Sequence, residues 1–243
     1  MSQKGTNRIY WELHGRGVPL FLAYTLTASP TPSDPSHAAL AGYLDRLTDR
    51  YRVLVMDYPN LGRSKPFPAS EMTADRVCAD VLAVADEAGF DRFAWWGFSW
   101  GGVIGLQLAS RSDRVAALVC GGWPPLGGPY ADLLKASRIM VPQFPADVPD
   151  VAQFVTFYES LRGWPEAESV AALTCPRMTY FGTADEVDLA GVRVPLAAIF
   201  QSHRQEIEQA GWHVAAIPGR DHSVWLDAAT VVPVVRPFLD RSI

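Results

Sequence analysis

The sequence predicts an α/β fold with a mostly parallel central sheet of about seven to eight strands and helices on both faces. Two observations predict it: short, almost uniformly apolar runs recur along the chain, and amphipathic segments of helix length separate them. Uniform apolarity indicates strands that are buried on both faces, as in a parallel sheet between helical layers. With 243 residues, 49% of them hydrophobic and 19% charged, the chain can bury such a core, with or without an insertion.

The expected elements follow one another from the N-terminus. Strands are expected at residues 8–14, 18–24, 51–56, 93–98, 115–120, 177–182 and 213–217. Helices are expected at residues 38–49, 70–88, from just after Ser99 to about 111, at 197–210 and from about 225 onward. The pair Asp34-Pro35 is a helix start signal, and Ser70 is a candidate N-cap. The last helix contains Pro233 and Pro237, which predict that it is broken or short.

The regular alternation stops after residue 122. A proline-containing, irregular stretch follows, in which residues 130–140 and 150–161 have helical patterns. Asp150 and Gln153 are spaced as in a capping box. We therefore expect residues 123–172 to form a small helical lid, inserted into an α/β core made of residues 1–122 and 173–243.

The most specific motif is Gly97-Phe98-Ser99-Trp100-Gly101, between a predicted strand and a predicted helix. A serine on so sharp a strand-to-helix turn has its side chain pushed out of the sheet, with the helix N-terminus beneath it. Glycine is needed on either side because a Cβ would collide with the neighbouring strand or helix. We predict that Ser99 is a nucleophile.

A serine hydroxyl is a weak nucleophile that needs a base, and the base needs an acid that orients it. His222 and Asp185 each come just after a predicted parallel strand. The carboxyl ends of such strands meet at one edge of the sheet, where sites in open α/β folds lie. We predict a catalytic triad of Ser99, Asp185 and His222, with Glu186 and Asp188 as nearby competitors for the acid.

With nucleophile, acid and histidine in this order, the chain resembles the α/β-hydrolase family over most of its length. The resemblance implies an α/β-hydrolase fold with a serine esterase-like activity. The segment Asp57-Tyr58-Pro59-Asn60-Leu61-Gly62-Arg63-Ser64 is similar to the family's Asp-x-x-Gly-x-Gly-x-Ser turn, with Asn60 in place of a glycine. Asparagine tolerates left-handed backbone angles, so we interpret this segment as a structural turn.

Acyl transfer also requires hydrogen-bond donors for the negative charge that develops on the carbonyl oxygen. The amide of Trp100, at the start of the helix after the nucleophile, is one predicted donor of this oxyanion hole. In the resembling family the second donor comes from a loop that usually begins with His-Gly, where this chain has Tyr24 and Thr25. Two alternatives stay open: the amide of Leu26 donates, which we favour, or the phenol of Tyr24 does.

Aromatic residues are frequent in the segments expected around Ser99. The predicted substrate pocket consists of Tyr24, Phe98, Trp123, Phe157 and Trp164, and the alternative for each is packing in the core. Trp100 is expected near the site because it follows the nucleophile. No cluster of Arg or Lys marks a clamp for phosphate or carboxylate, which favours an uncharged, partly apolar acyl substrate.

Charge and cysteine usage exclude several function classes. The net charge of −5 and the lack of a basic patch argue against nucleic-acid and membrane-surface partners. Residues 1–8 are polar, and no apolar run reaches the roughly 20 residues that span a bilayer, so we expect a cytoplasmic protein. Cys78, Cys120 and Cys175 lie far apart without metal-ligand spacing, and we expect free thiols, no metal and no cofactor.

These residues together predict a serine hydrolase that acts on a small-molecule substrate. The expected reaction cleaves an uncharged, partly apolar carboxylic ester, thioester or lactone through an acyl-enzyme. Because the oxyanion loop departs from the resembling family, a triad-bearing lyase or carbon–carbon bond hydrolase is the first alternative. A non-catalytic protein that binds a small ligand is the second. The sequence leaves the oligomeric state open.

Overall fold

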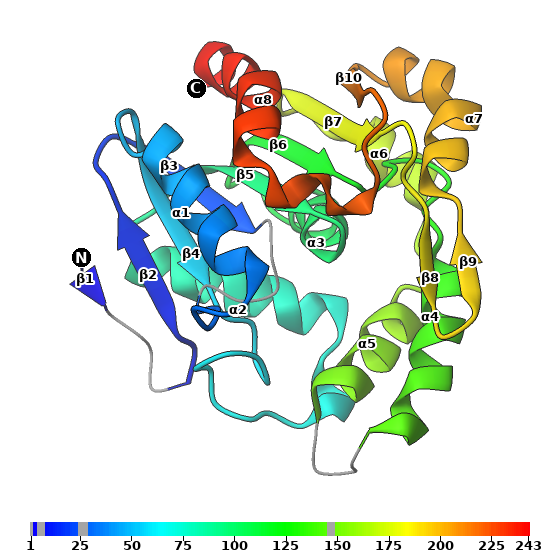
Figure 1. The fold of residues 1–243 in the computed structure, drawn as a ribbon. Coiled ribbons are helices and arrows are strands. Elements are labelled where there is room, and N and C mark those ends of the chain that lie inside the picture. The colour runs from blue at the N-terminus through cyan, green and yellow to red at the C-terminus, as the bar shows by residue number, and fades with distance from the viewer. Residues whose placement is uncertain (1, 4–7, 24–28, 145–148) are drawn as a thin grey trace.

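A central sheet runs through the molecule in the strand order β1-β2-β4-β3-β5-β6-β7-β10 (Figure 1). The computed structural model describes residues 2–3, 8–23, 29–144 and 149–243. The strands are β1 (Ser2–Gln3), β2 (Trp11–His14), β3 (Val18–Ala23), β4 (Tyr51–Met56), β5 (Phe93–Phe98), β6 (Val115–Gly121), β7 (Arg177–Gly182) and β10 (Trp212–Ile217). Among these strands β2 pairs antiparallel with β1 and β4, and the other pairs are parallel. The predicted mostly parallel sheet is confirmed.

Helices cover both faces of this sheet (Figure 1). They are α1 (Pro35–Leu47), α2 (Ala74–Glu87), α3 (Trp100–Ala109), α4 (Tyr130–Met140), α5 (Pro149–Ser160), α6 (Glu166–Ala171), α7 (Leu196–Gln209) and α8 (Ala228–Ser242). The side chains of α1 and α8 belong to one buried cluster, and those of α2 and α3 belong to another. Within the described ranges, no helix combines the length and apolarity that crossing a membrane requires.

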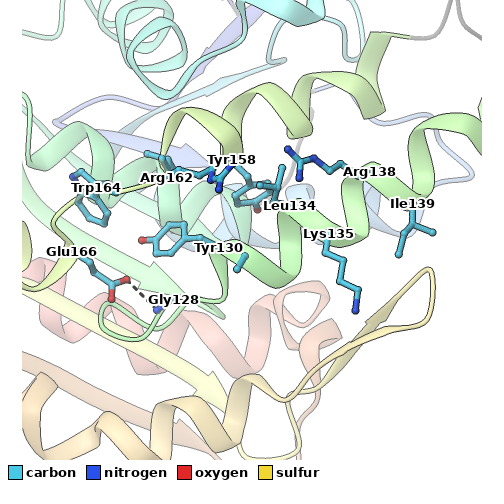
Figure 2. A pocket seen from close by; sticks show the side chains of 13 residues that line it. Gly128, Tyr130, Leu134, Lys135, Arg138, Ile139, Tyr158, Arg162, Trp164 and Glu166 are labelled. Atoms are coloured by element: carbon cyan, nitrogen blue, oxygen red, sulfur yellow. Dashed lines mark hydrogen bonds between the residues drawn. The ribbon is translucent and has the colours of Figure 1, made fainter.

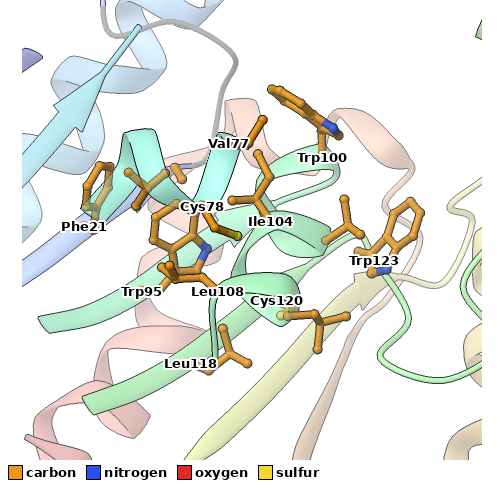
Figure 3. Packing of buried hydrophobic residues seen from close by; sticks show 14 of the residues in the cluster. Phe21, Val77, Cys78, Trp95, Trp100, Ile104, Leu108, Leu118, Cys120 and Trp123 are labelled. Atoms are coloured by element: carbon orange, nitrogen blue, oxygen red, sulfur yellow. The ribbon is translucent and has the colours of Figure 1, made fainter. Parts of the chain in front are cut away.

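Strand β5 shows why the apolar runs are uninterrupted. Successive side chains of a strand point to opposite faces of the sheet. Trp95 packs on the α2–α3 side, with its ring 4.9 Å from that of Phe21, whereas Trp96 packs on the α1–α8 side, 5.5 Å from Tyr43. Figure 3 shows Trp95 beside Leu108 of α3. Both faces of the strand are buried, so neither face needs polar residues.

Side-chain caps fix where α1 and α2 begin. Asp34 caps α1 by accepting a hydrogen bond from the Ser36 amide at 2.8 Å, which confirms the predicted start. Helix α2 begins at Ala74 and is capped by Thr73. The prediction that Ser70 caps this helix is wrong, because Ser70 lies in a separate 3₁₀ turn, η1 (Ala69–Glu71), before it.

Helix α8 is continuous, although Pro233 and Pro237 lie inside it. The prediction of a broken or short helix is therefore wrong. Each proline removes one backbone donor and disfavours the preceding turn. The fold overrides this cost because the helix buries one apolar face, which includes Val231, Val235 and Leu239, in the α1–α8 cluster.

Between β6 and β7 the chain forms α4, the 3₁₀ turn η2 (Val141–Gln143), α5 and α6. We call residues 123–172 the lid segment. Helices α4 and α5 match the two predicted helices closely, and α6 was not predicted. The side chain of Asp150, in the predicted capping box, lies outside the described part of the chain, and Gln153 accepts a hydrogen bond from Asn60 at 3.4 Å.

A hairpin of two short strands, β8 (Val187–Leu189) and β9 (Val192–Val194), follows β7 and lies beside α4 (Figure 1). Its Val192 and Val194 join a small buried cluster with Ala136 of α4. The sequence does not predict this hairpin, because strands of three residues are too short for an alternating pattern to be recognised.

Candidate active site

Ser99 lies on a strained turn between β5 and α3. Its φ of 52° is unusual for a residue with a side chain, and its amide donates to the Gly121 carbonyl at 2.7 Å. A Cβ on Gly97 would lie 2.0 Å from the Gly101 oxygen, and one on Gly101 would lie 1.9 Å from the Ala23 oxygen. Only glycine fits at these two positions, so the motif and the turn geometry require each other.

The structure brings the three predicted catalytic residues together. His222, the first residue of the 3₁₀ turn η3 (His222–Leu226) after β10, lies with its Nε2 3.0 Å from the Ser99 Oγ. Its Nδ1 lies 2.9 Å from Oδ1 of Asp185, which follows β7. Strands β7 and β10 pair in parallel, which places the two loops side by side at the carboxyl edge of the sheet.

The surroundings of Asp185 fix the orientation of the imidazole. The Asp185 side chain is fully buried, while that of His222 is partly exposed. An ionised carboxylate only accepts hydrogen bonds, so Nδ1 of His222 donates to it and Nε2 presents its lone pair to Ser99. The ring of Phe98 packs against the imidazole at 5.0 Å between centroids. This geometry suits a base that removes the proton of the Ser99 hydroxyl.

The acids near Asp185 and His222 in the sequence have other partners. Glu186 forms an ion pair with Arg193 at 2.7 Å, and Asp188 accepts from the Gly191 amide at 2.8 Å. Asp221, next to His222, caps η3, and its hydrogen bonds from Ser223 hold the pKa of its carboxyl below the usual value. Of the acids that surround the predicted triad, Asp185 is the one that the structure places on the imidazole.

Of the two predicted donors of the oxyanion hole, the first lies within the described residues and the second does not. Trp100 is the first residue of α3, and among the described residues no carbonyl accepts from its amide. A free amide at a helix N-terminus is well placed to bind developing negative charge. Tyr24 and Leu26, the alternative second donors, lie outside the described residues.

A cavity of about 600 Å³ opens over Ser99 and His222. We call it the catalytic cavity; it is lined by Asp34, Ser36, Leu61, Phe98, Ser99, Trp100, Leu133, Ser137, Met140, Phe154, Tyr158, Leu189, His222 and Trp225. Most of these side chains are apolar or aromatic. Among the described lining residues, Asp34 is the one side chain that carries a fixed charge.

Of the predicted pocket residues, Phe98 lines this cavity, and Tyr24 lies outside the described residues. Trp123 and Phe157 do not line it: both belong to the lid segment and are buried in its core, where Trp123 packs against Tyr158 and Phe157 against Trp100. Trp164 lines a different cavity between α4 and α5 (Figure 2). Leu133, Met140, Leu189 and Trp225 also line the catalytic cavity, and no motif in the sequence predicts this.

The segment 57–64 is held by its first residue, as a structural turn requires. The buried Asp57 carboxylate accepts from the Ser29 amide at 2.9 Å and from the Arg63 amide at 2.7 Å. Asn60 has a φ of 68°, the left-handed conformation that the sequence predicted. These contacts brace the loop beside the lid segment.

Thiols and metal-ligating groups do not compete with Ser99 in the described part of the chain. Burial raises the pKa of the Cys78 thiol to about 12 and raises that of Cys120 as well, so both stay protonated near neutral pH. Over the described ranges, His, Cys, Asp and Glu form no group of three that could hold a metal ion.

Comparisons with known proteins identify the fold family. Residues 33–167 match the family model of the alpha/beta hydrolase fold, more than half of the chain and including Ser99 but not Asp185 or His222. Over its whole length the chain is similar to the crystal structure of an alpha/beta hydrolase enzyme from the sediment metagenome of the Mar Chica lagoon, Morocco. The TM-score is 0.71, the identity is 15% and both chains are covered completely, a likeness of fold.

Curated relatives match about half of the chain. It is 31% identical over 117 residues to a probable proline iminopeptidase of Streptomyces coelicolor, covering 45% of this chain and 34% of that protein. It is 32% identical over 115 residues to a pimeloyl-[acyl-carrier protein] methyl ester esterase of Pectobacterium carotovorum, covering 46% of this chain and 39% of that protein. The chain thus spans well under two thirds of the length of these relatives.

Proposed function

The chain belongs to the alpha/beta hydrolase fold family, and we propose on that basis that it is a serine hydrolase. The proposed reaction cleaves an uncharged, partly apolar carboxylic ester, thioester or lactone through an acyl-enzyme. The single observation that carries the proposal is the hydrogen-bonded series Ser99–His222–Asp185, with distances of 3.0 and 2.9 Å. The esterase named among the relatives supports an ester substrate.

In the proposed mechanism His222 removes the Ser99 proton as Oγ attacks the substrate carbonyl. Asp185 keeps the imidazole in the required tautomer and stabilises its charged form. The Trp100 amide binds the oxygen that becomes negative, and a second donor from the loop at residues 24–26 completes the hole. His222 then gives its proton to the leaving alcohol, thiol or, for a lactone, the ring oxygen. A water molecule, activated by the same imidazole, releases the acid and restores Ser99.

The lining of the catalytic cavity supports an uncharged, partly apolar substrate. Trp100, Phe154 and Leu133 give it apolar walls, and no described lining residue is a lysine or arginine that could pair with an anionic substrate. We propose that the lid segment closes this side of the cavity, because α4 and α5 supply Leu133, Met140, Phe154 and Tyr158. The core of residues 1–122 and 173–243 then carries the reacting groups.

A fluorophosphonate probe, which reacts with activated serines, tests the proposal directly. Labelling should disappear in Ser99→Ala and fall sharply in His222→Ala, whereas Ser202→Ala, an exposed serine on α7, should label like the wild type. Labelling that persists in Ser99→Ala would overturn the nucleophile. A panel of p-nitrophenyl esters tests the substrate class, and labelling without turnover of any ester would favour the lyase or carbon–carbon bond hydrolase branch.

A further inference from the structure

A second cavity, of about 860 Å³, lies in the lid segment away from Ser99 (Figure 2). We call it the lid cavity; it is lined by Gly128, Tyr130, Ala131, Leu134, Lys135, Arg138, Ile139, Tyr158, Leu161, Arg162, Gly163, Trp164 and Glu166. Neither Ser99 nor His222 lines it. Tyr158 lines both cavities, so its ring is a shared wall between them.

The floor of the lid cavity is apolar. Leu134 from α4 and Tyr158 from α5 are buried, and Leu161 continues the same surface toward Trp164. The rings of Tyr130 and Trp164 pack edge to face, 6.0 Å apart. Such a floor stabilises a ligand by removing a hydrocarbon chain from water.

One end of the cavity carries an excess of positive charge. The guanidinium groups of Arg138 and Arg162 share the single carboxylate of Glu159, so among the described residues two positive charges face one negative charge here. Lys135 adds a third cation, and within the described residues no carboxylate lies within 4 Å of its ammonium group. Arginine and lysine side chains of this kind bind carboxylates through charge-assisted hydrogen bonds.

The opposite end carries Glu166. Its carboxylate accepts from the amides of Gly127 at 2.7 Å and Gly128 at 3.1 Å, and burial raises its pKa. Figure 2 shows Glu166 at one side of the cavity and Lys135 and Arg138 at the other. A negatively charged ligand group is therefore repelled by Glu166 and attracted toward Lys135 and Arg138.

We propose that the lid cavity binds a carboxylate with an apolar tail. The carboxylate lies against the guanidinium group of Arg138, Lys135 adds a second positive charge on the same helix, and the tail lies along Tyr158, Leu161 and Trp164. Acids of this class are what the proposed hydrolysis would release. The catalytic cavity is unsuited to hold them, because Asp34 carries the one fixed charge among its described lining residues. The binding itself does not depend on catalysis, so it can be tested whether or not Ser99 is a nucleophile.

Octanoate is a suitable probe for isothermal titration calorimetry, used with the full chain at pH 8, where imidazoles are neutral and carboxylates charged. We expect binding that weakens as salt is added, and much weaker binding of 1-octanol and octyltrimethylammonium, which have the same tail without the negative charge. Equal affinity for the three probes would overturn the proposal, as would no binding of octanoate.

Substitutions then locate the site. The double variant Lys135→Gln/Arg138→Gln should weaken octanoate binding by about tenfold, because one charge-assisted contact and one further positive charge are lost. Lys65→Gln/Arg204→Gln makes the same change at two exposed positions that line neither cavity, and its Kd should equal that of the wild type. Ser99→Ala should also bind normally, so loss of activity and loss of binding are separate results.

A comparison of two variants shows which of the two cavities binds octanoate. If octanoate occupied the catalytic cavity, Asp34→Asn would tighten its binding by removing a repulsive charge, and Lys135→Gln/Arg138→Gln would leave it unchanged. That pattern would overturn the proposal. The reverse pattern, in which Asp34→Asn has no effect and the lid variant weakens binding, is the expected one. Thermal denaturation of each variant checks that the fold is intact.

Discussion

The catalytic cavity and the lid cavity share the ring of Tyr158 but are built in opposite ways. The first lies at the carboxyl edge of the sheet, where backbone strain, close-packed glycines and a buried acid fix the positions of Ser99 and His222. The second has a buried apolar floor between α4 and α5, and its described lining residues include three cations and one acid. The catalytic cavity is the smaller of the two, so its rigid position at the sheet edge, and not its volume, is what suits it to chemistry.

The largest expected difference concerns the acid of the proposed triad. Asp185→Asn should lower kcat/KM for a p-nitrophenyl ester by about two to four orders of magnitude, because the amide no longer holds His222 in the required tautomer. The affinity of the lid cavity for octanoate should be unaffected. Asp188→Asn, on the adjoining hairpin, is the matched control and should keep most of the activity. A loss of less than tenfold in Asp185→Asn would contradict its assigned role.

The second difference concerns backbone tolerance. In Gly97→Ala the new Cβ would overlap the Gly101 carbonyl at 2.0 Å, and we expect the free energy of unfolding to fall by at least ~3 kcal/mol. Gly163, beside the lid cavity, has a φ of 77° but no described atom within 4 Å of its added Cβ. Gly163→Ala should therefore cost only about 1–2 kcal/mol of left-handed strain. Urea unfolding of both variants measures the comparison, and equal costs would show that the two regions are equally constrained.

The smallest expected difference concerns charge selection by Asp34. An ester whose acyl chain ends in a carboxylate should be a poorer substrate than its neutral analogue, and Asp34→Asn should reduce that discrimination by about threefold to tenfold. Asparagine still caps a helix well, so α1 should keep its start.

Hydrogen bonds from Ser36 hold the pKa of Asp34 below its usual value. The carboxylate is then charged throughout the range from about pH 5 to 8, and the discrimination should be constant over that range. Ratios of kcat/KM at several pH values and salt concentrations check this expectation. Discrimination that is unchanged in Asp34→Asn would show that shape, and not charge, selects the substrate.

The three residues of the proposed triad were more predictable from sequence than the residues around them. Ser99, Asp185 and His222 each follow a strand that its apolarity reveals, and parallel strands bring their carboxyl ends together. No comparable rule predicts the surroundings of Trp123, Phe157 and Trp164, because whether a ring faces a cavity depends on how α4 and α5 pack. The continuous helix through Pro233 likewise reflects tertiary packing that overrides a local preference.

The β8–β9 hairpin has a mechanical consequence for the lid segment. It starts two residues after Asp185, and its Val192 and Val194 pack against α4. Helix α5 has a separate contact with the core, because the Ala74 amide of α2 donates to the Ser160 hydroxyl at 3.0 Å. The lid segment is thus held by these side-chain contacts as well as by its two chain connections to the core. A hinge motion of the whole segment would have to strip these valines from their contacts, which costs roughly 1.5–3 kcal/mol for each fully buried side chain. We therefore expect these contacts to oppose a hinge motion of the whole segment.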